Sequence, residues 1–189
     1  LFALREQGRE AFIRQGLPTA KTEAWKYTRP RDLQVDDFVM QTSPCRCADD
    51  CDCEHHSHSS LDDVLPFDCY ALHFDNGHLR HEHLPLPRGV QIMPLSDAFS
   101  FADDIKSRLG KTLNLDKYPF AALNTAYLNE GVYISIAKHT RLDKPLALVY
   151  HTHSCHDNLF FNLRNLIVVE SGAQVELVEY HHYSGAEKS

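Results

Sequence analysis

The sequence predicts an α+β fold, in which a mainly helical N-terminal region leads into a series of short β-strands. Three observations support this prediction. Apolar residues recur at helical spacing in three segments before residue 131. From Val132 onward they alternate with polar residues, as they do in strands. The strand-like runs also follow one another without an intervening helix, which excludes βαβ crossovers and leaves a sandwich, a cupin-like barrel or a β-solenoid.

Each predicted helix is bounded by residues that begin or end helices. A glycine, which readily takes the left-handed conformation at a helix C-terminus, follows each one. Pro18 prevents the first helix from continuing, and Ser96 is a favourable N-cap for the second. We expect all three apolar faces to pack against other elements rather than to line ligand pockets. The helices and their glycines are 1–15 with Gly16, 96–109 with Gly110, and 120–130 with Gly131, the last with a buried stripe of Phe120, Leu123 and Tyr127.

One β-hairpin and four later strands are predicted. Asp75-Asn76-Gly77 supplies turn residues that accept positive φ directly after the strand-like run 70–74, so a hairpin is expected there. Beyond residue 130, turn-forming residues separate the runs 132–136, 146–152, 163–170 and 174–183. We therefore expect an α-rich region with a hairpin over residues 1–130 and a β-rich core over residues 131–189.

Composition and charge exclude several classes of protein. The 189 residues are 43% hydrophobic and 24% charged, which is typical of a globular protein. The net charge of −7 argues against a general nucleic-acid-binding protein, because contacts to phosphates need a clustered basic surface. No apolar run approaches the roughly 20 residues needed to cross a bilayer. The first residues do not form a basic-then-apolar segment, so we expect no secretory leader. We expect a cytoplasmic protein that binds neither nucleic acid nor membrane.

A Cys- and His-rich stretch is the strongest candidate for metal binding. Residues 42–60 lack apolar periodicity, which predicts a solvated loop. Thiolate and imidazole are natural ligands of zinc, nickel and iron. However, the interleaved acidic residues oppose thiolate formation until a cation binds, and the loop has no core to fix its geometry. The candidate ligands are Cys45, Cys47, Cys51, Cys53, His55 and His56, with His58 nearby. We favour the alternative, a variable polar insertion with no metal function.

The remaining histidines and cysteines are weaker candidates. His81 and His83, like His151 and His153, would lie on one face of a strand, where each pair supplies half of a metal site. Hydrogen-bonded surface histidines are the commoner outcome. A cupin-like metalloenzyme is the least favoured hypothesis, because its site needs several histidines and a carboxylate that converge inside one barrel. Isolated cysteines are more often small buried side chains than nucleophiles, which applies to Cys69 and Cys155.

The segment after the first helix resembles a motif of a known family. It is similar to the GLPTxKxExWKYT element near the N-terminus of the SufB/SufD family of iron–sulfur cluster assembly proteins, and of its SufD branch in particular. Segments 120–136, 142–146 and 170–179 resemble that family's lead into its core and its first core strands, so the resemblance reaches both ends of the chain. The matching motif residues, for which we expect a structural role, are Gly16, Leu17, Pro18, Thr19, Lys21, Glu23, Trp25, Lys26, Tyr27 and Thr28.

The resemblance implies both a fold and a function. It implies that the helical region leads into the first rungs of a right-handed parallel β-helix, and that the chain is the N-terminal part of a longer protein. It also implies membership of a SufBCD-type scaffold complex, with a SufB-like subunit and a SufC-like ATPase as partners. In that family the SufD-like subunit is not itself an enzyme, and the Fe–S cluster belongs to the whole complex. The family's cluster-related Cys and His have no counterparts here.

The motif itself contains no arrangement typical of catalysis. It has no paired carboxylates, no Ser/His/Asp set and no phosphate-binding glycine loop. Trp25 and Tyr27 have large apolar faces with polar tips, which anchor a loop on a core more often than they grip a partner. Basic residues around them would suit an acidic partner, although such patches are more often simply solvated. They are Lys21, Lys26, Arg29 and Arg31.

Overall fold

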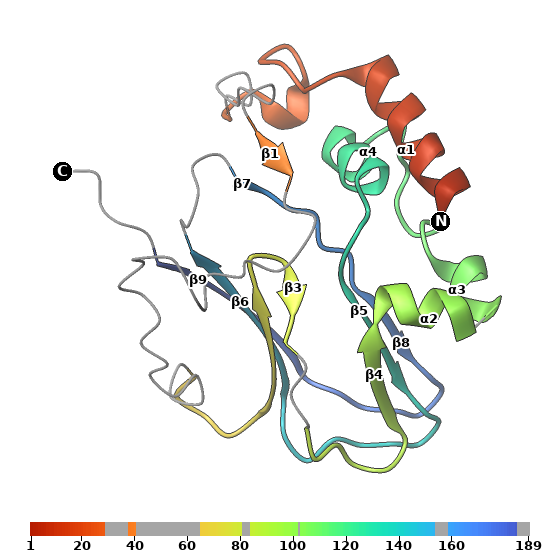
Figure 1. Ribbon diagram of the computed structural model, residues 1–189, viewed down its shortest axis with the longest axis vertical. Coiled ribbons are helices and arrows are strands. Elements are labelled where there is room, and N and C mark those ends of the chain that lie inside the picture. The colour runs from red at the N-terminus through yellow and green to blue at the C-terminus, as the bar shows by residue number, and fades with distance from the viewer. Residues whose placement is uncertain (29–37, 41–64, 81–83, 102, 154–158, 185–189) are drawn as a thin grey trace.

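The computed structural model describes residues 1–28, 38–40, 65–80, 84–101, 103–153 and 159–184. Figure 1 shows helices α1 and α4 side by side at one end of the molecule, with most of the strands beyond them. Helices α2 and α3 lie against the sheet that contains β4 and β5. The helices are α1 (Phe2–Gln15), α2 (Leu95–Phe101), α3 (Asp103–Arg108) and α4 (Pro119–Ala126), and a 3₁₀ turn covers Glu23–Trp25.

Helices α1 and α4 approach each other unusually closely. A Cβ added to Gly8 would lie 2.5 Å from the backbone nitrogen of Ala126, so the contact between the helices requires a glycine. Two long side chains of α1 reinforce it. Arg5 Nε donates to the carbonyl of Leu128 at 2.7 Å, and Gln15 Nε2 donates to the carbonyl of Leu115 at 2.5 Å. The helix pair is therefore held by backbone packing as well as by side-chain hydrogen bonds.

The strands form two larger sheets and one short pair. The four-stranded sheet has the order β3-β2-β6-β9, the three-stranded sheet has the order β4-β5-β8, and β1 pairs with β7. The β2–β3 and β4–β5 pairs are antiparallel, whereas β2–β6, β6–β9, β5–β8 and β1–β7 are parallel. The strands are β1 (Val39–Met40), β2 (Tyr70–Asp75), β3 (His78–Leu79), β4 (Val90–Pro94), β5 (Val132–Ile136), β6 (Leu146–His153), β7 (Leu159–Phe160), β8 (Leu166–Val169) and β9 (Leu177–Ser184).

Parallel neighbours in the second half of the chain are separated by a nearly constant length of sequence. Tyr133 of β5 pairs with Leu166 of β8, 33 positions later. Leu146 of β6 pairs with Leu177 of β9, 31 positions later. Two successive passes of the chain therefore run beside each other in register. The isolated parallel bridges Glu130–Leu163 and Arg141–Gln174 keep the same spacing.

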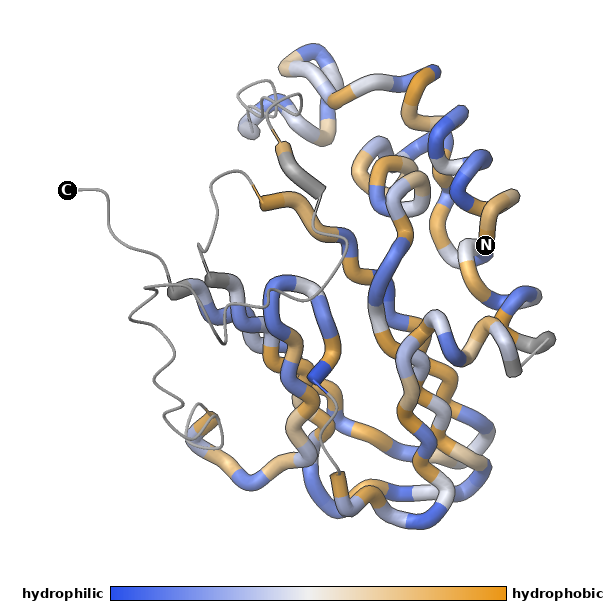
Figure 2. The backbone as a smooth tube through the Cα atoms, in the orientation of Figure 1, coloured by the Kyte–Doolittle hydropathy of each residue, from blue (hydrophilic) through white to orange (hydrophobic). Residues whose placement is uncertain are grey.

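The main core lies between the two larger sheets. Strand β5 alternates buried and partly buried residues, as its sequence predicts, and Figure 2 shows hydrophobic and hydrophilic residues alternating along the strands. Strand β6 departs from this pattern, because residues 146–151 are all buried. Buried core residues contributed by the strands include Leu72, Phe74, Val132, Ile134, Ile136, Leu146, Leu148 and Tyr150. A second cluster under α2 and α3 contains Leu95, Ala98, Ile105, Leu109 and Leu128.

Several predicted elements are confirmed, and one helix is corrected. Helix α1 ends before Gly16, the hairpin turn has positive φ at Asn76 and Gly77, and β5 has its predicted bounds. The helix predicted over 96–109 corresponds to α2 and α3, on either side of residue 102, which lies outside the described residues. The helix predicted over 120–130 is wrong at its end.

Helix α4 stops at Ala126 because the following residues bond elsewhere. The carbonyl of Leu128 accepts from Arg5, and Glu130 bridges to Leu163. Tyr127, predicted to be buried, is 46% exposed. Gly131 is not a helix cap: a Cβ there would lie 1.9 Å from the carbonyl oxygen of Arg164, so this glycine lets the two chain segments meet.

Both larger sheets contain strands from either side of residue 130. Strand β2 is the parallel neighbour of β6, and β4 is the antiparallel neighbour of β5. The core expected for residues 131–189 thus also includes strands from the first part of the chain.

Candidate functional site

The motif segment, residues 16–28, is attached to the fold at two points. Pro18 is buried, and the half-buried Trp25 packs its ring against Phe120 of α4, with centroids 5.0 Å apart and planes at 47°. Between these points the backbone bonds to itself. Thr22 N donates to the carbonyl of Thr19, and Trp25 N to that of Thr22, both at 2.8 Å. The structural role expected for Trp25 is thus consistent with its contact to α4.

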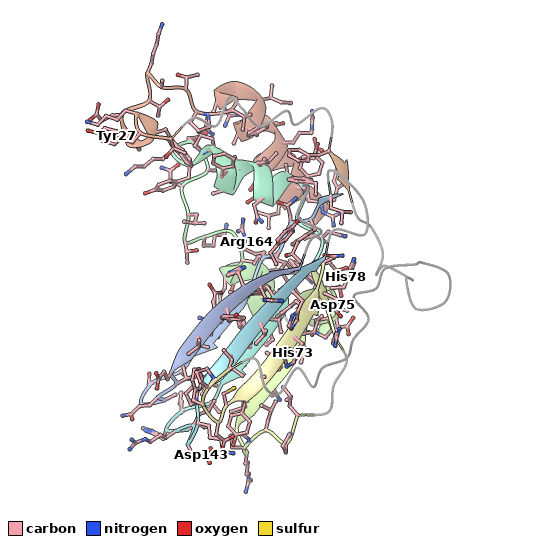
Figure 3. The ribbon with its side chains drawn as sticks, turned by 90° about the vertical axis from the view of Figure 1, so that its left-hand side faces the viewer. Tyr27, His73, Asp75, His78, Asp143 and Arg164 are labelled. Atoms are coloured by element: carbon pink, nitrogen blue, oxygen red, sulfur yellow. The ribbon has the colours of Figure 1, made fainter. Side chains whose placement is uncertain are left out.

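Apart from Trp25, the side chains of residues 19–28 are exposed to solvent. Tyr27 is 92% exposed and stands at the far end of the molecule from the sheets (Figure 3). Lys26 Nζ lies 2.6 Å from Glu23 Oε1 and 5.1 Å from the centroid of the Tyr27 ring. Tyr27 therefore contributes almost nothing to the packing of the fold, unlike Trp25 two residues earlier.

A buried histidine pair joins β2 to β6. His73 Nδ1 lies 3.1 Å from His151 Nε2, and each side chain is only 3% exposed. The ring centroids are 5.4 Å apart with planes at 17°, so the centroid separation exceeds the N···N distance by about the width of one ring. The rings therefore lie end to end. This is the geometry of a linear N–H···N hydrogen bond, in which one histidine donates and the other accepts.

Charged and titratable groups surround this pair on the same face. His151 lies in register between Asp75 of β2 and His182 of β9, and Asp75 forms an ion pair with Arg80. Burial lowers the pKa of His151 to about 4. The nearby Asp75 acts against this shift and raises the pKa, whereas His73 lowers it further. His151 is therefore neutral at neutral pH.

The histidine pair is not arranged as a metal site. A shared ion needs lone pairs that converge on one point, whereas these two nitrogens point at each other through a shared proton. Among the described residues, no group of three or more His, Cys, Asp or Glu side chains is placed to hold a metal ion. The pair is best understood as a cross-strand hydrogen bond that satisfies two buried polar groups.

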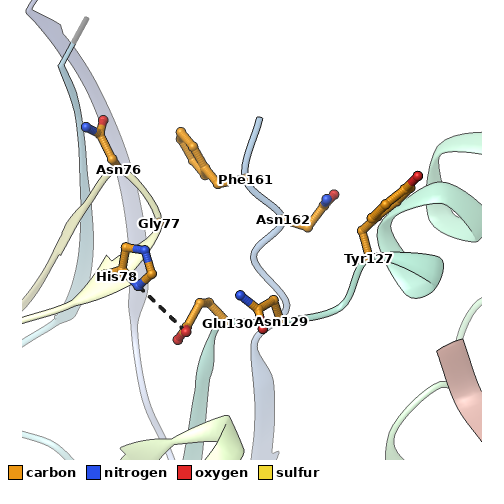
Figure 4. A pocket seen from close by; sticks show the side chains of 8 residues that line it. All are labelled: Asn76, Gly77, His78, Tyr127, Asn129, Glu130, Phe161 and Asn162. Atoms are coloured by element: carbon orange, nitrogen blue, oxygen red, sulfur yellow. Dashed lines mark ion pairs between the residues drawn. The ribbon is translucent and has the colours of Figure 1, made fainter. Parts of the chain in front are cut away.

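A small pocket lies where the hairpin, the α4–β5 connection and the β7–β8 connection meet (Figure 4). His78 Nδ1 lies 3.6 Å from Glu130 Oε1 at this pocket, and Tyr127 and Phe161 supply aromatic walls. Its volume of about 10 Å³ suits about one water molecule. Asn162 Nδ2, which is buried, has no hydrogen-bond partner among the described residues. The pocket is thus too small for a substrate and suits a single bridging water.

Next to the pocket, one asparagine connects α4 to the β7–β8 connection. Asn124 Nδ2 donates to the carbonyl of Leu163 at 3.0 Å, and its Oδ1 accepts from Arg164 Nε at 2.8 Å. Arg164 Nη2 also donates to Thr125 Oγ1 at 2.9 Å, and burial lowers the pKa of the guanidinium. This network fixes α4 against the connection that leads into β8.

Most of the predicted metal ligands lie outside the described residues. This applies to Cys45, Cys47, Cys51, Cys53, His55 and His56, and also to His81, His83 and Cys155. Of the other candidates, Cys69 is partly buried, and His153 lies at the end of β6. His151 is buried against His73 on the neighbouring strand.

Comparison with known proteins identifies the family. The profile of the SufBD protein N-terminal region matches residues 1–148, which is most of the chain. The chain belongs to the SufB/SufD family. The family resemblance of the motif segment is thereby confirmed, and this segment lies wholly within the matched region.

Two proteins of Arabidopsis thaliana match this SufB/SufD chain over 92 residues. The iron–sulfur cluster assembly SufBD family protein ABCI9 is 37% identical, and the chloroplastic SufBD family protein ABCI8 is 34% identical. The matched residues make up 48% of this chain in both cases, but only 19% of the first relative and 16% of the second. The chain therefore spans less than a fifth of these relatives. No helix in the described ranges is both long enough and apolar enough to span a membrane.

Sequence reasoning missed the contacts that join distant parts of this SufB/SufD chain. His73 was not paired with His151, because 78 residues separate them and only the β2–β6 register brings them together. Asn124 lies in a segment that resembles the family, but the sequence does not connect it with Arg164. The one available signal was the run Asn162 to Asn165, four mostly polar residues directly before an apolar strand.

Proposed function

We propose that this chain is the N-terminal part of a non-catalytic subunit of an iron–sulfur cluster assembly scaffold. The observation that carries this proposal is the family match over residues 1–148, which includes helices α1 to α4 and strands β1 to β5. The names of both relatives, which place them in iron–sulfur cluster assembly, support the same role. A scaffold subunit acts through surfaces that bind other subunits rather than through one reactive pocket.

The parallel strand pairs support a further part of this proposal, that β5, β6, β8 and β9 begin a right-handed parallel β-helix. Successive passes of the chain pair in parallel at spacings of 33 and 31 residues, which is the arrangement that a solenoid repeats. An immunoglobulin-like sandwich or a cupin-like barrel would instead pair these strands antiparallel. The sandwich and cupin alternatives are therefore not favoured.

The motif segment favours the SufD branch over the SufB branch. We accordingly propose a SufB-like subunit and a SufC-like ATPase as partners, in the cytoplasm, with neither nucleic acid nor membrane involved. The Fe–S cluster is then the cargo of the whole complex, and this chain holds no cofactor of its own. Zinc, nickel or iron at the Cys/His-rich stretch belongs to the alternative hypothesis of a metal-binding module.

Affinity purification from the native cells tests these proposals together. The tagged protein is isolated without oxygen, with and without residues 45–58, and its partners, iron and acid-labile sulfide are measured. We expect both forms to retain SufB-like and SufC-like partners and equal iron. Retained partners with loss of iron would establish the metal-binding alternative. Absence of both partners would contradict the scaffold proposal, and co-purification of a SufD-like protein instead of a SufB-like one would reverse the branch.

A further inference from the structure

We propose that residues 19–28, the exposed part of the motif segment, form a docking surface for an acidic protein segment, with Tyr27 as its apolar anchor. This surface needs only a partner of that chemistry, and it does not depend on the partner being an Fe–S assembly protein. The inference rests on three properties of residues 19–28: their rigidity, their exposure and their charge.

Residues 19–28 are ordered before any partner binds. Trp25 is fixed against Phe120, and backbone hydrogen bonds link Thr19 to Thr22, Thr22 to Trp25, and Trp25 to Thr28 at 2.8–2.9 Å. A surface that is already ordered loses little conformational entropy on binding. A larger part of the interaction energy of its contacts therefore contributes to the binding free energy. This local order is what a binding surface requires.

The side chains that this order positions are not used by the fold. Trp25 is the only partly buried residue between positions 19 and 28, and Tyr27 is 92% exposed. Tyrosine is enriched at the energetic centres of protein interfaces, because it has a large apolar ring with a polar tip. Residues 19–28 thus form an ordered turn in which the exposed ring of Tyr27, directed away from the core, is the largest apolar surface.

The charge of residues 19–28 selects the partner. They carry two lysines and one glutamate, in a chain whose net charge is −7. Lys26 Nζ lies 5.1 Å from the Tyr27 ring centroid and contacts Glu23, whereas Lys21 forms no ion pair with any of the described residues. A partner carboxylate can bind Lys21 directly and replace Glu23 at Lys26, beside the Tyr27 ring that the partner would cover. A basic partner would face both ammonium groups.

The chain offers a matched control for this surface. Lys117 Nζ lies 5.3 Å from the centroid of the Tyr118 ring, which repeats the arrangement of Lys26 and Tyr27. Tyr118 is 46% exposed, but it directly precedes α4, which is fixed to the sheets. If any exposed Lys–Tyr pair binds acidic proteins, both pairs will do so.

The test is photo-crosslinking of the full-length protein in its native cells, with a benzophenone amino acid at position 28. We expect one protein adduct whose cross-linked peptide contains more Asp and Glu than Lys and Arg. Tyr27→Ser and the double variant Lys21→Glu, Lys26→Glu should each reduce the adduct at least fivefold. Tyr118→Ser and Lys117→Glu should leave it unchanged, and the thermal melting of all variants should match the wild type.

Four results would overturn the proposal. The first is an adduct yield no higher than that from the same probe at position 119, and the second is a neutral or basic cross-linked peptide. The third is an adduct with lipid or nucleic acid. The fourth is an adduct that persists in both the Tyr27 variant and the double lysine variant. The double lysine variant tests charge without removing the ring, so it remains informative if Tyr27→Ser disturbs the turn.

Discussion

Strand β6 and residues 19–28 are both ordered, but for opposite reasons. From residue 146 to residue 151 every side chain of β6 is buried, and the strand has a parallel neighbour on each side. Residues 19–28 instead bond mainly to their own backbone, and Trp25 makes the ring contact that attaches them to α4. Order in β6 comes from burial, whereas order in residues 19–28 comes from local hydrogen bonds and one anchor.

This difference separates stability from binding. Substitutions in β6 should change the free energy of unfolding, because they create cavities or leave buried polar groups without partners. Substitutions of the exposed side chains in residues 19–28 should change association and leave stability almost unaltered. The following predictions test that separation, in order of decreasing effect.

Truncation of a core residue of β6 should have the largest effect. Leu148 is completely buried, so Leu148→Ala should lower the free energy of unfolding by about 2–5 kcal/mol through lost burial and the cavity left behind. Chemical denaturation of the purified protein measures this change. A loss below about 1 kcal/mol would mean that the β2–β6–β9 sheet is not packed as described.

Acid should destabilise the fold through His151 of β6. The pKa of His151 is about 4 in the fold, against about 6.5 when unfolded, so the unfolded state binds more protons between these values. Stability should therefore be complete above pH 6.5 and should fall by at most about 3 kcal/mol as the pH decreases to 4. The pH dependence of unfolding in His151→Gln should be flatter than in the wild type, and an unchanged slope would mean that His151 does not cause the loss of stability.

Loss of one hydroxyl in β6 should have a smaller effect. Asn165 Nδ2 donates to the Tyr150 hydroxyl at 2.6 Å, and burial raises the pKa of Tyr150 to about 12. Tyr150→Phe leaves this amide without its acceptor and should cost about 1–2 kcal/mol. Amide hydrogen exchange should locate the loss in β6 and at the start of β8. Unchanged exchange there would show that Asn165 finds another acceptor.

Tyr27→Ser should have almost no effect on stability. The side chain is 92% exposed, so the change in unfolding free energy should stay within about 0.5 kcal/mol. Trp25→Ala, two residues earlier, should cost more, because it removes the contact with Phe120. Equal costs for the two variants would mean that residues 19–28 are held by more than this one anchor.

The sequence predicted the elements that are determined locally. Asp75-Asn76-Gly77 specified the hairpin because asparagine and glycine accept the positive φ that its turn requires. Helix α1 ended at Gly16 for a similar local reason. In the motif segment, the sequence leaves anchoring and partner binding as alternatives for Trp25 and Tyr27. The structure assigns anchoring to Trp25 and leaves Tyr27 exposed.

Features that depend on distant partners were not predictable. The predicted end of α4 lies four residues too late, because the apolar spacing of the helix continues beyond Ala126. The backbone of these later residues instead bonds to Arg5 and pairs with Leu163. The pairing of His73 with His151 depends on strand register, which alternation alone does not give. The Cys/His-rich stretch lies outside the described residues, so its proposed metal function stays a prediction.

The hydrogen bonds of Asn124 also connect residues 19–28, through α4, to the parallel strands. Tyr27 stands two residues from Trp25, Trp25 rests on Phe120 of α4, and α4 is tied through Asn124 to Leu163 and Arg164, which lead directly into β8. A displacement of this segment can therefore be transmitted to the parallel strands through consecutive contacts. Residues 19–28 are thus connected to the parallel strands through one aromatic contact and one set of side-chain hydrogen bonds.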